Sequence, residues 1–415
     1  MSKRWLVLLV GALLAAAACG NDDGDDSNAA PGGGGQEDPA PGEGCDDSDP
    51  IVIGVANTVS GPSAQIGVST QQGFDLARDH LNEAGGVLGR CLTFITKDDG
   101  GEPTKAAQVM RELVDEDEVD AVLGPFLSSA MGATLDITTQ AGIVQIVLGT
   151  LPEAGDATLY PYVFRPENPS TGQAPAIAAF VDRAGFESAA VLGVNNGLGQ
   201  ALVPAVAAEL EELGVDVQAT ELHEGGLVDF GPQLRNVLAG DPEVLVLANI
   251  GTDAVNTLRS LQLVAPDLPV VGLGVIADRP TIEAVGFDNM ENVYAGPTYR
   301  PLTRLPGSDD PSTDEATAFR DAFAELIGQD PLTVNIQQPA AAYDDVMMLA
   351  AAIEAAGEID ADAIRAHLEE NGHEGVRGTY RFTEENHDGV DWRETVFVLA
   401  RSLDDGTLEL APGEV

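Results

Sequence analysis

The side chains best suited to catalysis or metal binding are few and scattered in this chain. Its five histidines fall on expected helices or in polar turns, with no shared partner: His80, His223, His367, His373 and His387. The sequence has no H-E-x-x-H or Cys–His metal spacing and no G-x-S-x-G nucleophile turn. A G-x-G-x-x-A stretch at 272–277 leaves dinucleotide binding as a weak alternative, because no early βαβ unit surrounds it. We therefore expect no enzyme, no cofactor and no metal site.

Ser128 and Ser129 suggest a different chemistry, the binding of an anion. They follow an expected strand at 121–124 and open an expected helix at 129–141. The exposed N–H groups and the positive dipole end at a helix start suit an anion. The alternative is that one of the serines only caps the helix, and the two roles can coexist.

Alternating strands and helices would position these serines. We expect strands at 51–55, 92–96, 121–124, 144–147, 189–194, 215–219, 244–247, 270–273, 293–295, 378–382 and 396–400. We expect helices at 65–84, 104–114, 129–141, 172–184, 199–213, 230–238, 253–264, 280–285, 314–328, 340–356 and 361–371. This alternation predicts an α/β fold of parallel sheets with helices on both faces. Because the pattern restarts after the fourth strand, we expect two similar lobes, with 162–165 and 294–299 as crossings between them. Ligands bind at the carboxyl ends of such strands, so two facing edges would enclose a cleft.

The first residues have the plan of an export signal. Lys3 and Arg4 precede an apolar run that ends in small residues, which predicts a signal peptide at 1–18. The run is too short to span a bilayer. Cys19 follows four alanines, at 15–18, and resembles the lipidated cysteine of bacterial lipoproteins; an ordinary signal peptide is the alternative. The polar stretch after it predicts a lipidated Cys and disordered tether at 19–48.

Charge and cysteine content restrict the partners further. Asp and Glu number 68 against 20 Lys and Arg, so the net charge is -48 and neither nucleic acid nor an anionic membrane surface is an expected partner. A high-salt habitat and a high-GC genome both remain open as explanations of the acidic composition.

Cys45 and Cys91 form the expected disulfide of an exported protein, with two free thiols as the alternative.

Seven sequence blocks resemble one family in the same order, from about residue 50 to residue 400. The family is that of the solute-binding proteins of ABC importers for branched-chain amino acids and amides. The blocks lie at 53–67, 73–90, 97–108, 121–130, 162–173, 228–230 and 341–353. The resemblance implies two Rossmann-like lobes with parallel sheets and three hinge crossovers, the class I periplasmic binding fold. We place lobe 1 at 49–164 plus 300–375 and lobe 2 at 165–299 plus 376–415.

The resemblance also implies a function and its partners. The chain would be an exported lipoprotein on the outer face of the cell membrane, held there by its lipid anchor only. It would capture a small amino acid, amide or related acid between the lobes and deliver it to ABC permease subunits, as a monomer. A sensor or receptor domain of the same fold is the alternative.

Matching to the family assigns the ligand site. Ser128 falls where the family's serine meets the ligand carboxylate, and Thr150 lies in the loop that grips the ammonium and carboxylate groups. The expected ligand-binding residues are Ile66, Phe126, Ser128, Ser129, Gly149, Thr150, Leu198, Asn249, Ile250 and Asp278.

Two departures from the family bear on the ligand. Ile66, Leu198 and Ile250 replace three tyrosines of leucine-binding relatives, and Gly274 replaces their acidic ammonium ligand. A buried ammonium without a carboxylate is costly, which argues against a plain L-amino acid and favours a solute with a sizeable apolar part. Asp278 or Asp253 could supply the carboxylate; otherwise both are helix caps or surface acids.

Overall fold

The computed structural model describes residues 44–167, 169–277, 279–299, 312–329, 336–390, 395–402 and 408–411. The predicted signal peptide, Cys19, most of the tether and Asp278 lie outside these residues. The first strand begins at Asp46, whereas the tether was predicted to extend to residue 48. Within the described part of the chain, no helix is both long enough and apolar enough to cross a bilayer.

The first sheet is parallel throughout, in the order β2-β1-β3-β4-β5. Its strands are β1 (Asp46–Asn57), β2 (Arg90–Asp98), β3 (Ala121–Leu123), β4 (Gln145–Ile146) and β5 (Val163–Phe164). Alternate side chains of β1 enter different cores: Ile53 and Val55 belong to one apolar cluster, and Ala56 belongs to another. This two-residue period requires helices on both faces of the sheet.

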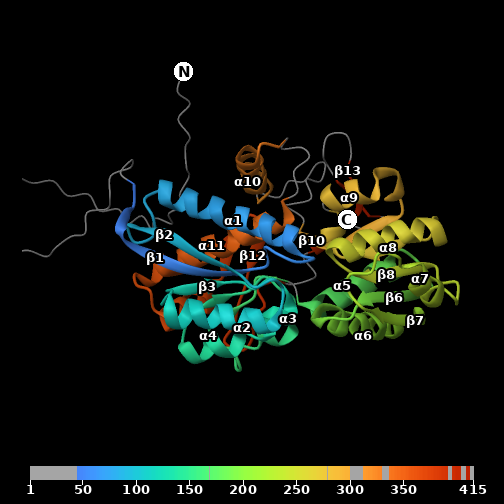
Figure 1. Cartoon of the computed structure of the whole chain (residues 1–415), viewed down its shortest axis with the longest axis horizontal. Helices are drawn as coiled ribbons and strands as arrows, with labels where there is room; N and C mark the ends of the chain where they lie inside the picture. Colours follow the sequence, from blue (N-terminus) through green and yellow to red (C-terminus); the bar gives the residue numbers. More distant parts are fainter. Residues whose placement is uncertain are drawn as a thin grey trace, which may run out of the picture. The chain divides into compact units, whose positions relative to one another are not determined.

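Helices cover both faces of this sheet (Figure 1). One apolar cluster includes α1 (Ala64–Glu83), α11 (Gln337–Ala356) and α12 (Ala361–Asn371). The other includes α2 (Pro103–Arg111), the π-helical turn η1 (Glu112–Glu116) and α4 (Leu135–Ala141). A further helix, α10 (Ser312–Ile327), packs against Leu76 of α1.

The second sheet has the order β14-β13-β10-β9-β8-β6-β7. The parallel strands are β6 (Ser188–Val194), β7 (Asp216–His223), β8 (Val244–Ala248), β9 (Val270–Gly272) and β10 (Val293–Tyr299). The antiparallel strands are β13 (Thr395–Ser402) and β14 (Leu408–Leu410). One face packs against α5 (Ser170–Arg183) and α6 (Gly197–Glu212), and the other against α7 (Gly231–Val237), α8 (Gly251–Val264) and α9 (Arg279–Val285).

The chain passes between the two sheets three times, and this arrangement confirms the predicted fold class. The passages lie between β5 and α5, between β10 and α10, and between Val390 and β13.

One domain boundary differs from the prediction, which placed all of 376–415 in the second lobe. Tyr380 and Phe382 pack in the core of the first sheet, next to α11. Their segment includes the ribbon of β11 (His373–Gly375) and β12 (Gly378–Tyr380), and the chain returns to the second sheet only at β13.

Two local predictions also differ from the structure. The helix expected at 129–141 is two helices, α3 (Ser128–Gly132) and α4, separated at Thr134. The Thr134 hydroxyl donates to the Met131 carbonyl and accepts from the Gln145 side chain. The segment read as a crossing at 162–165 contains β5, which completes the edge of the first sheet.

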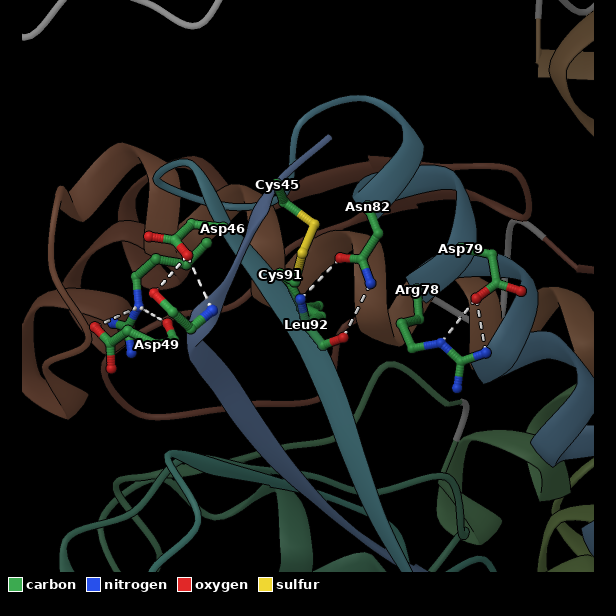
Figure 2. The surroundings of a disulfide bond; sticks show 10 residues. Cys45, Asp46, Asp49, Arg78, Asp79, Asn82, Cys91 and Leu92 are labelled. Carbon is green, nitrogen blue, oxygen red and sulfur yellow. Dashed lines mark hydrogen bonds and ion pairs between the residues drawn. A yellow bond between two sulfur atoms is a disulfide. The ribbon is translucent and has the colours of Figure 1, made fainter. Parts of the chain in front are cut away.

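The structure joins Cys45 and Cys91 in a disulfide, as expected from the sequence (Figure 2). Cys45 directly precedes β1 and Cys91 lies in β2, with 4.9 Å between their Cα atoms. Next to the bridge, the Asn82 side chain accepts from the Leu92 N–H and donates to its carbonyl, which fixes α1 to β2. Gly86 leaves room for the bridge, since a Cβ there would lie 2.6 Å from the Cys45 Cβ.

Candidate functional site

A cavity of about 110 Å³ lies among the loops that follow the strands of both sheets. The first sheet contributes residues after β3, β4 and β5, and the second contributes residues after β6, β8 and β9. The lining is Phe126, Leu127, Ser128, Ser129, Leu148, Gly149, Thr150, Glu167, Gln173, Asn196, Gly197, Leu198, Ile250, Leu273, Gly274, Val275, Pro297, Gln337, Gln338 and Arg377. This is the position expected for a ligand site in parallel α/β sheets.

Two glycines bring the first sheet's loops together. Gly124 has a φ of +87°, and a Cβ there would lie 2.2 Å from the carbonyl oxygen of Ala56. A Cβ on Gly149 would lie 2.4 Å from the carbonyl oxygen of Phe126. The loops after β3 and β4 therefore touch through their backbones, which places Ser128 beside Thr150.

Ser128 and Thr150 form the polar group of this wall. Their hydroxyl oxygens lie 3.5 Å apart, and Ser128 is only 8% exposed. The alternative that a serine caps the helix is not seen, because Leu127 is the N-cap residue of α3 and no side chain bonds there. The helix has only five residues, so its dipole is weaker than the predicted long helix would supply. The two hydroxyls can both offer hydrogen bonds to a polar group in the cavity.

The second sheet contributes a mainly apolar wall. Asn196 is the N-cap of α6, where its side chain accepts from the N–H groups of Leu198 and Gly199. Leu198, Ile250, Leu273 and Val275 line the cavity beyond it. These aliphatic side chains suit the apolar part of a solute.

A second polar group lines the cavity where the first passage, the start of α11 and the turn between β11 and β12 meet it. Glu167, in the first passage, forms an ion pair with Arg377, which follows β11. Gln173, Gln337 and Gln338 lie in the same lining. Sequence reasoning missed this group, although Glu167 lies inside the 162–173 block; only the fold brings Arg377 to it.

Two buried acids of α11 support the position of Arg377. Asp344 accepts from the N–H groups of Val376 and Arg377, at 2.8 and 3.0 Å, and from the Tyr380 hydroxyl at 2.6 Å. Burial raises the pKa of Asp344 to about 6, against the lowering effect of these hydrogen bonds. Burial also raises the pKa of Asp345 well above its usual range, although the nearby Arg377 opposes this shift.

Most of the predicted ligand residues line the cavity, but not all. Ile66 is absent from the lining, and so is Asn249, which is fully buried and bonds His223 and Thr257. Asp253 accepts from the Gly226 N–H and is not in the lining either. Of the two predicted substitute carboxylates, Asp253 is therefore excluded by its position and Asp278 lies outside the described residues.

Over the part of the chain that the structure describes, no group of three or more acidic, His or Cys side chains could hold a metal ion.

Comparison with known proteins agrees with this geometry. The family model of the periplasmic binding proteins matches residues 50–393, so the chain belongs to that family. The chain is 27% identical over 341 residues to the leucine-, isoleucine-, valine-, threonine- and alanine-binding protein of Pseudomonas aeruginosa, covering 81% of this chain and 87% of that protein. It is 29% identical over 208 residues to the chemotactic signal transduction system substrate-binding protein BasB of Halobacterium salinarum, which covers 47% of this chain and 49% of BasB.

A solved structure supports the fold. The branched-chain amino acid transporter substrate binding protein LivJ of Streptococcus pneumoniae, in complex with isoleucine, superposes with a TM-score of 0.73 at 24% identity. The match covers 88% of this chain and all of LivJ. All three proteins are named as binding proteins for amino acids or substrates.

Proposed function

We propose that this protein is an extracytoplasmic solute-binding protein of an ABC importer. It captures a small polar or amphipathic solute, such as an amino acid, an amide or a related acid, and delivers it to the permease. The observation that carries the proposal is the cavity at the strand ends of both sheets, with the Ser128 and Thr150 hydroxyls on one wall and aliphatic side chains on the other. A relative that binds leucine, isoleucine, valine, threonine and alanine supports this ligand class.

We expect Ser128→Ala to weaken solute binding. The change removes a hydrogen bond to a charged group, a loss of roughly 1.5–3 kcal/mol, or about ten- to a hundredfold in affinity. Calorimetry with the best solute from a thermal-shift screen of amino acids, amides, urea and short acids measures the loss. Thr158→Ala, which removes an exposed hydroxyl of the first lobe, is the matched control. Equal affinity of Ser128→Ala and the parent would show that Ser128 does not hold the carboxylate.

The two sheets with their helices would act as two lobes that close on the solute. The solute docks on the first lobe at Ser128, and contacts to both lobes then favour the closed state. Gly197 supports a close approach of α6, in the second lobe, to α3 in the first. A Cβ on Gly197 would lie 3.3 Å from the Ser129 backbone nitrogen and 3.4 Å from the Ser128 Cβ. We propose the domain division of the sequence analysis for these lobes, with 376–390 moved to the first.

Lipid anchoring is part of the same proposal. Cys19 follows an apolar run and precedes a polar tether, the pattern of a lipidated N-terminus. Mass spectrometry of membrane-extracted protein should find a diacylglyceryl group on Cys19. Recovery of unmodified protein from the medium, cleaved at another residue, would show that the protein is not anchored through Cys19.

A sensory role is the second candidate, favoured by the similarity to the chemotactic substrate-binding protein BasB. Both roles need the same cavity, so solute binding does not separate them. Uptake of the radiolabelled solute by cells with and without the gene does: loss of uptake supports transport, whereas unchanged uptake with a lost tactic response supports sensing.

A further inference from the structure

Both lobes of the proposed division carry a large negative charge. Residues 49–164 and 300–390, the first lobe, hold 35 acidic and 11 basic side chains, a formal net charge of -24. Residues 165–299 and 391–415, the second lobe, hold 24 acidic and 7 basic side chains, a formal net charge of -17. Like charges on two bodies raise the free energy of bringing them together. Closure of the lobes therefore raises the electrostatic free energy, whatever solute is bound.

The loop after β1, in the first lobe, touches the start of α8, in the second. A Cβ on Gly251, which has a φ of +56°, would lie 3.7 Å from the Pro62 carbonyl oxygen. The loop after β2 lies against the same β1 loop, because a Cβ on Gly61 would lie 3.2 Å from the Gly100 carbonyl oxygen. Two neighbouring loops of the first lobe therefore meet the second lobe at this contact.

Acidic side chains edge this contact on the second lobe. Asp253 lies two residues after Gly251, and its carboxylate accepts from the Gly226 N–H at 2.9 Å. This bond joins the loop after β7 to the start of α8, and Glu224 is the exposed first residue of that loop. We call Glu224 and Asp253 the second rim, with a formal charge of two acids.

Acidic side chains also edge the contact on the first lobe. Asp98 ends β2, Asp99 is fully buried and accepts from the Thr58 hydroxyl at 2.6 Å, and Glu102 is the exposed N-cap residue of α2. Lys105 pairs with Asp98 at 2.6 Å, so its charge is balanced within its own lobe. We call Asp98, Asp99, Glu102 and Lys105 the first rim. Both rims are thus net negative at the point where the lobes touch.

Taking lobe closure from the proposed function, we infer that ionic strength sets the balance between the open and closed forms through the repulsion of these two rims. The Debye length falls from about 10 Å at 0.1 M salt to about 3 Å at 1 M. Dilute salt therefore favours the open form, and concentrated salt screens the repulsion and favours the closed form. A solute without net charge is bound more tightly as salt rises, because the closed form holds it from both lobes. Of the two explanations of the acidic composition, this favours a high-salt habitat.

Small-angle X-ray scattering of the protein without its predicted signal peptide and without solute tests the inference, because closure lowers the radius of gyration. The radius of gyration of the parent should fall between about 0.05 and 1 M NaCl and then level off. Glu224→Lys puts a cation on the second rim and should show the same fall at about half the salt concentration or less. The residues before Gly44 are the same in both chains, so their contribution cancels in the comparison.

Two variants with the same change of charge, placed away from the rims, are the controls. Exposed Glu211 lies near the far end of α6, roughly 20 Å along the helix from its start at the cavity, and Glu211→Lys should follow the parent. On the first lobe, Glu102→Lys should act like the change at Glu224. Its control is Glu116→Lys, at the exposed end of η1 beyond α2.

The outcomes separate the inference from the proposed function. Equal shifts in the rim variants and their controls, or a parent radius of gyration that does not change with salt, would overturn the inference. Circular dichroism at each salt concentration distinguishes opening from unfolding, and a radius that rises only together with loss of the native signal would also overturn it. Solute binding by a parent whose radius ignores salt refutes the inference alone. A parent that binds no solute of the screen at either about 0.1 or 1 M NaCl refutes the proposed function.

Discussion

Replacement of Asp388 by alanine is expected to destabilise the protein by about 3–5 kcal/mol, because it leaves a buried guanidinium without its partner. Asp388 pairs with Arg165, whose side chain is fully buried and also donates to the Leu151 carbonyl. Burial lowers the pKa of Arg165 and raises the pKa of Asp388, so each group incurs a desolvation cost that the other offsets. Gly155 makes the arrangement possible, since a Cβ there would overlap the Asp388 carboxylate.

The pair also joins the first passage between the sheets to the segment that leads into the third. The Arg165 N–H donates to the His387 carbonyl, and the Gly389 N–H donates to the Arg165 carbonyl, at 3.0 and 2.9 Å. The His387 ring stacks on Phe164 with 4.0 Å between ring centroids. Loss of Asp388 therefore weakens the contact between the first passage and the segment that leads into the third, where the proposed closure of the lobes would bend the chain.

Denaturant unfolding followed by circular dichroism measures the effect of Asp388→Ala. The control is Asp79→Ala, which removes the acid of an exposed arginine pair and should cost at most about 1 kcal/mol. If the two variants lose equal stability, the Arg165–Asp388 pair does not stabilise the passages as described.

Loss of the Cys45–Cys91 disulfide is the second large expected effect. The bridge closes a loop with a sequence separation of 46 residues. Its removal in a Cys45→Ser, Cys91→Ser double variant should lower the free energy of unfolding by about 4 kcal/mol on the chain-entropy model. Urea unfolding of oxidised parent and double variant gives the difference.

Reduced parent protein is the control for the serine substitutions and should unfold with the double variant. Peptide mapping without reductant should recover the two cysteines joined in the parent. Free thiols at both positions in exported protein, or equal stability of oxidised and reduced parent, would contradict the structural role of the bridge.

The fold could be predicted largely because its signals are local. Buried-strand runs such as 51–55 and 189–194 alternate with amphipathic helices, and this alternation alone defines parallel sheets. The predictions are wrong where contacts between distant parts of the chain determine the local structure. Residues 376–390 carry no signal of their own that assigns them to a lobe, and only packing against α11 places them in the first. The division between α3 and α4 depends on Thr134 and its partner Gln145, eleven residues away.

The site could be predicted where single loops build it. Ser128 and Thr150 each follow a strand within a short segment, so their position at the sheet edge follows from the strand order. The partnership of Glu167 with Arg377 could not be predicted, because it joins segments 210 residues apart in sequence. Asn249 also shows the limit of this reasoning: it follows a strand as expected, but its amide is turned to the buried His223 and Thr257.

A crystal structure of the protein with the best solute of the screen tests the central claim most directly. The solute should occupy the cavity between the strand ends of the two sheets, with its carboxylate or equivalent polar group within hydrogen-bond distance of the Ser128 and Thr150 hydroxyls. Its apolar part should contact Leu198 and Ile250. A solute bound outside this cavity, or one that fills it without contact to either hydroxyl, would contradict the account.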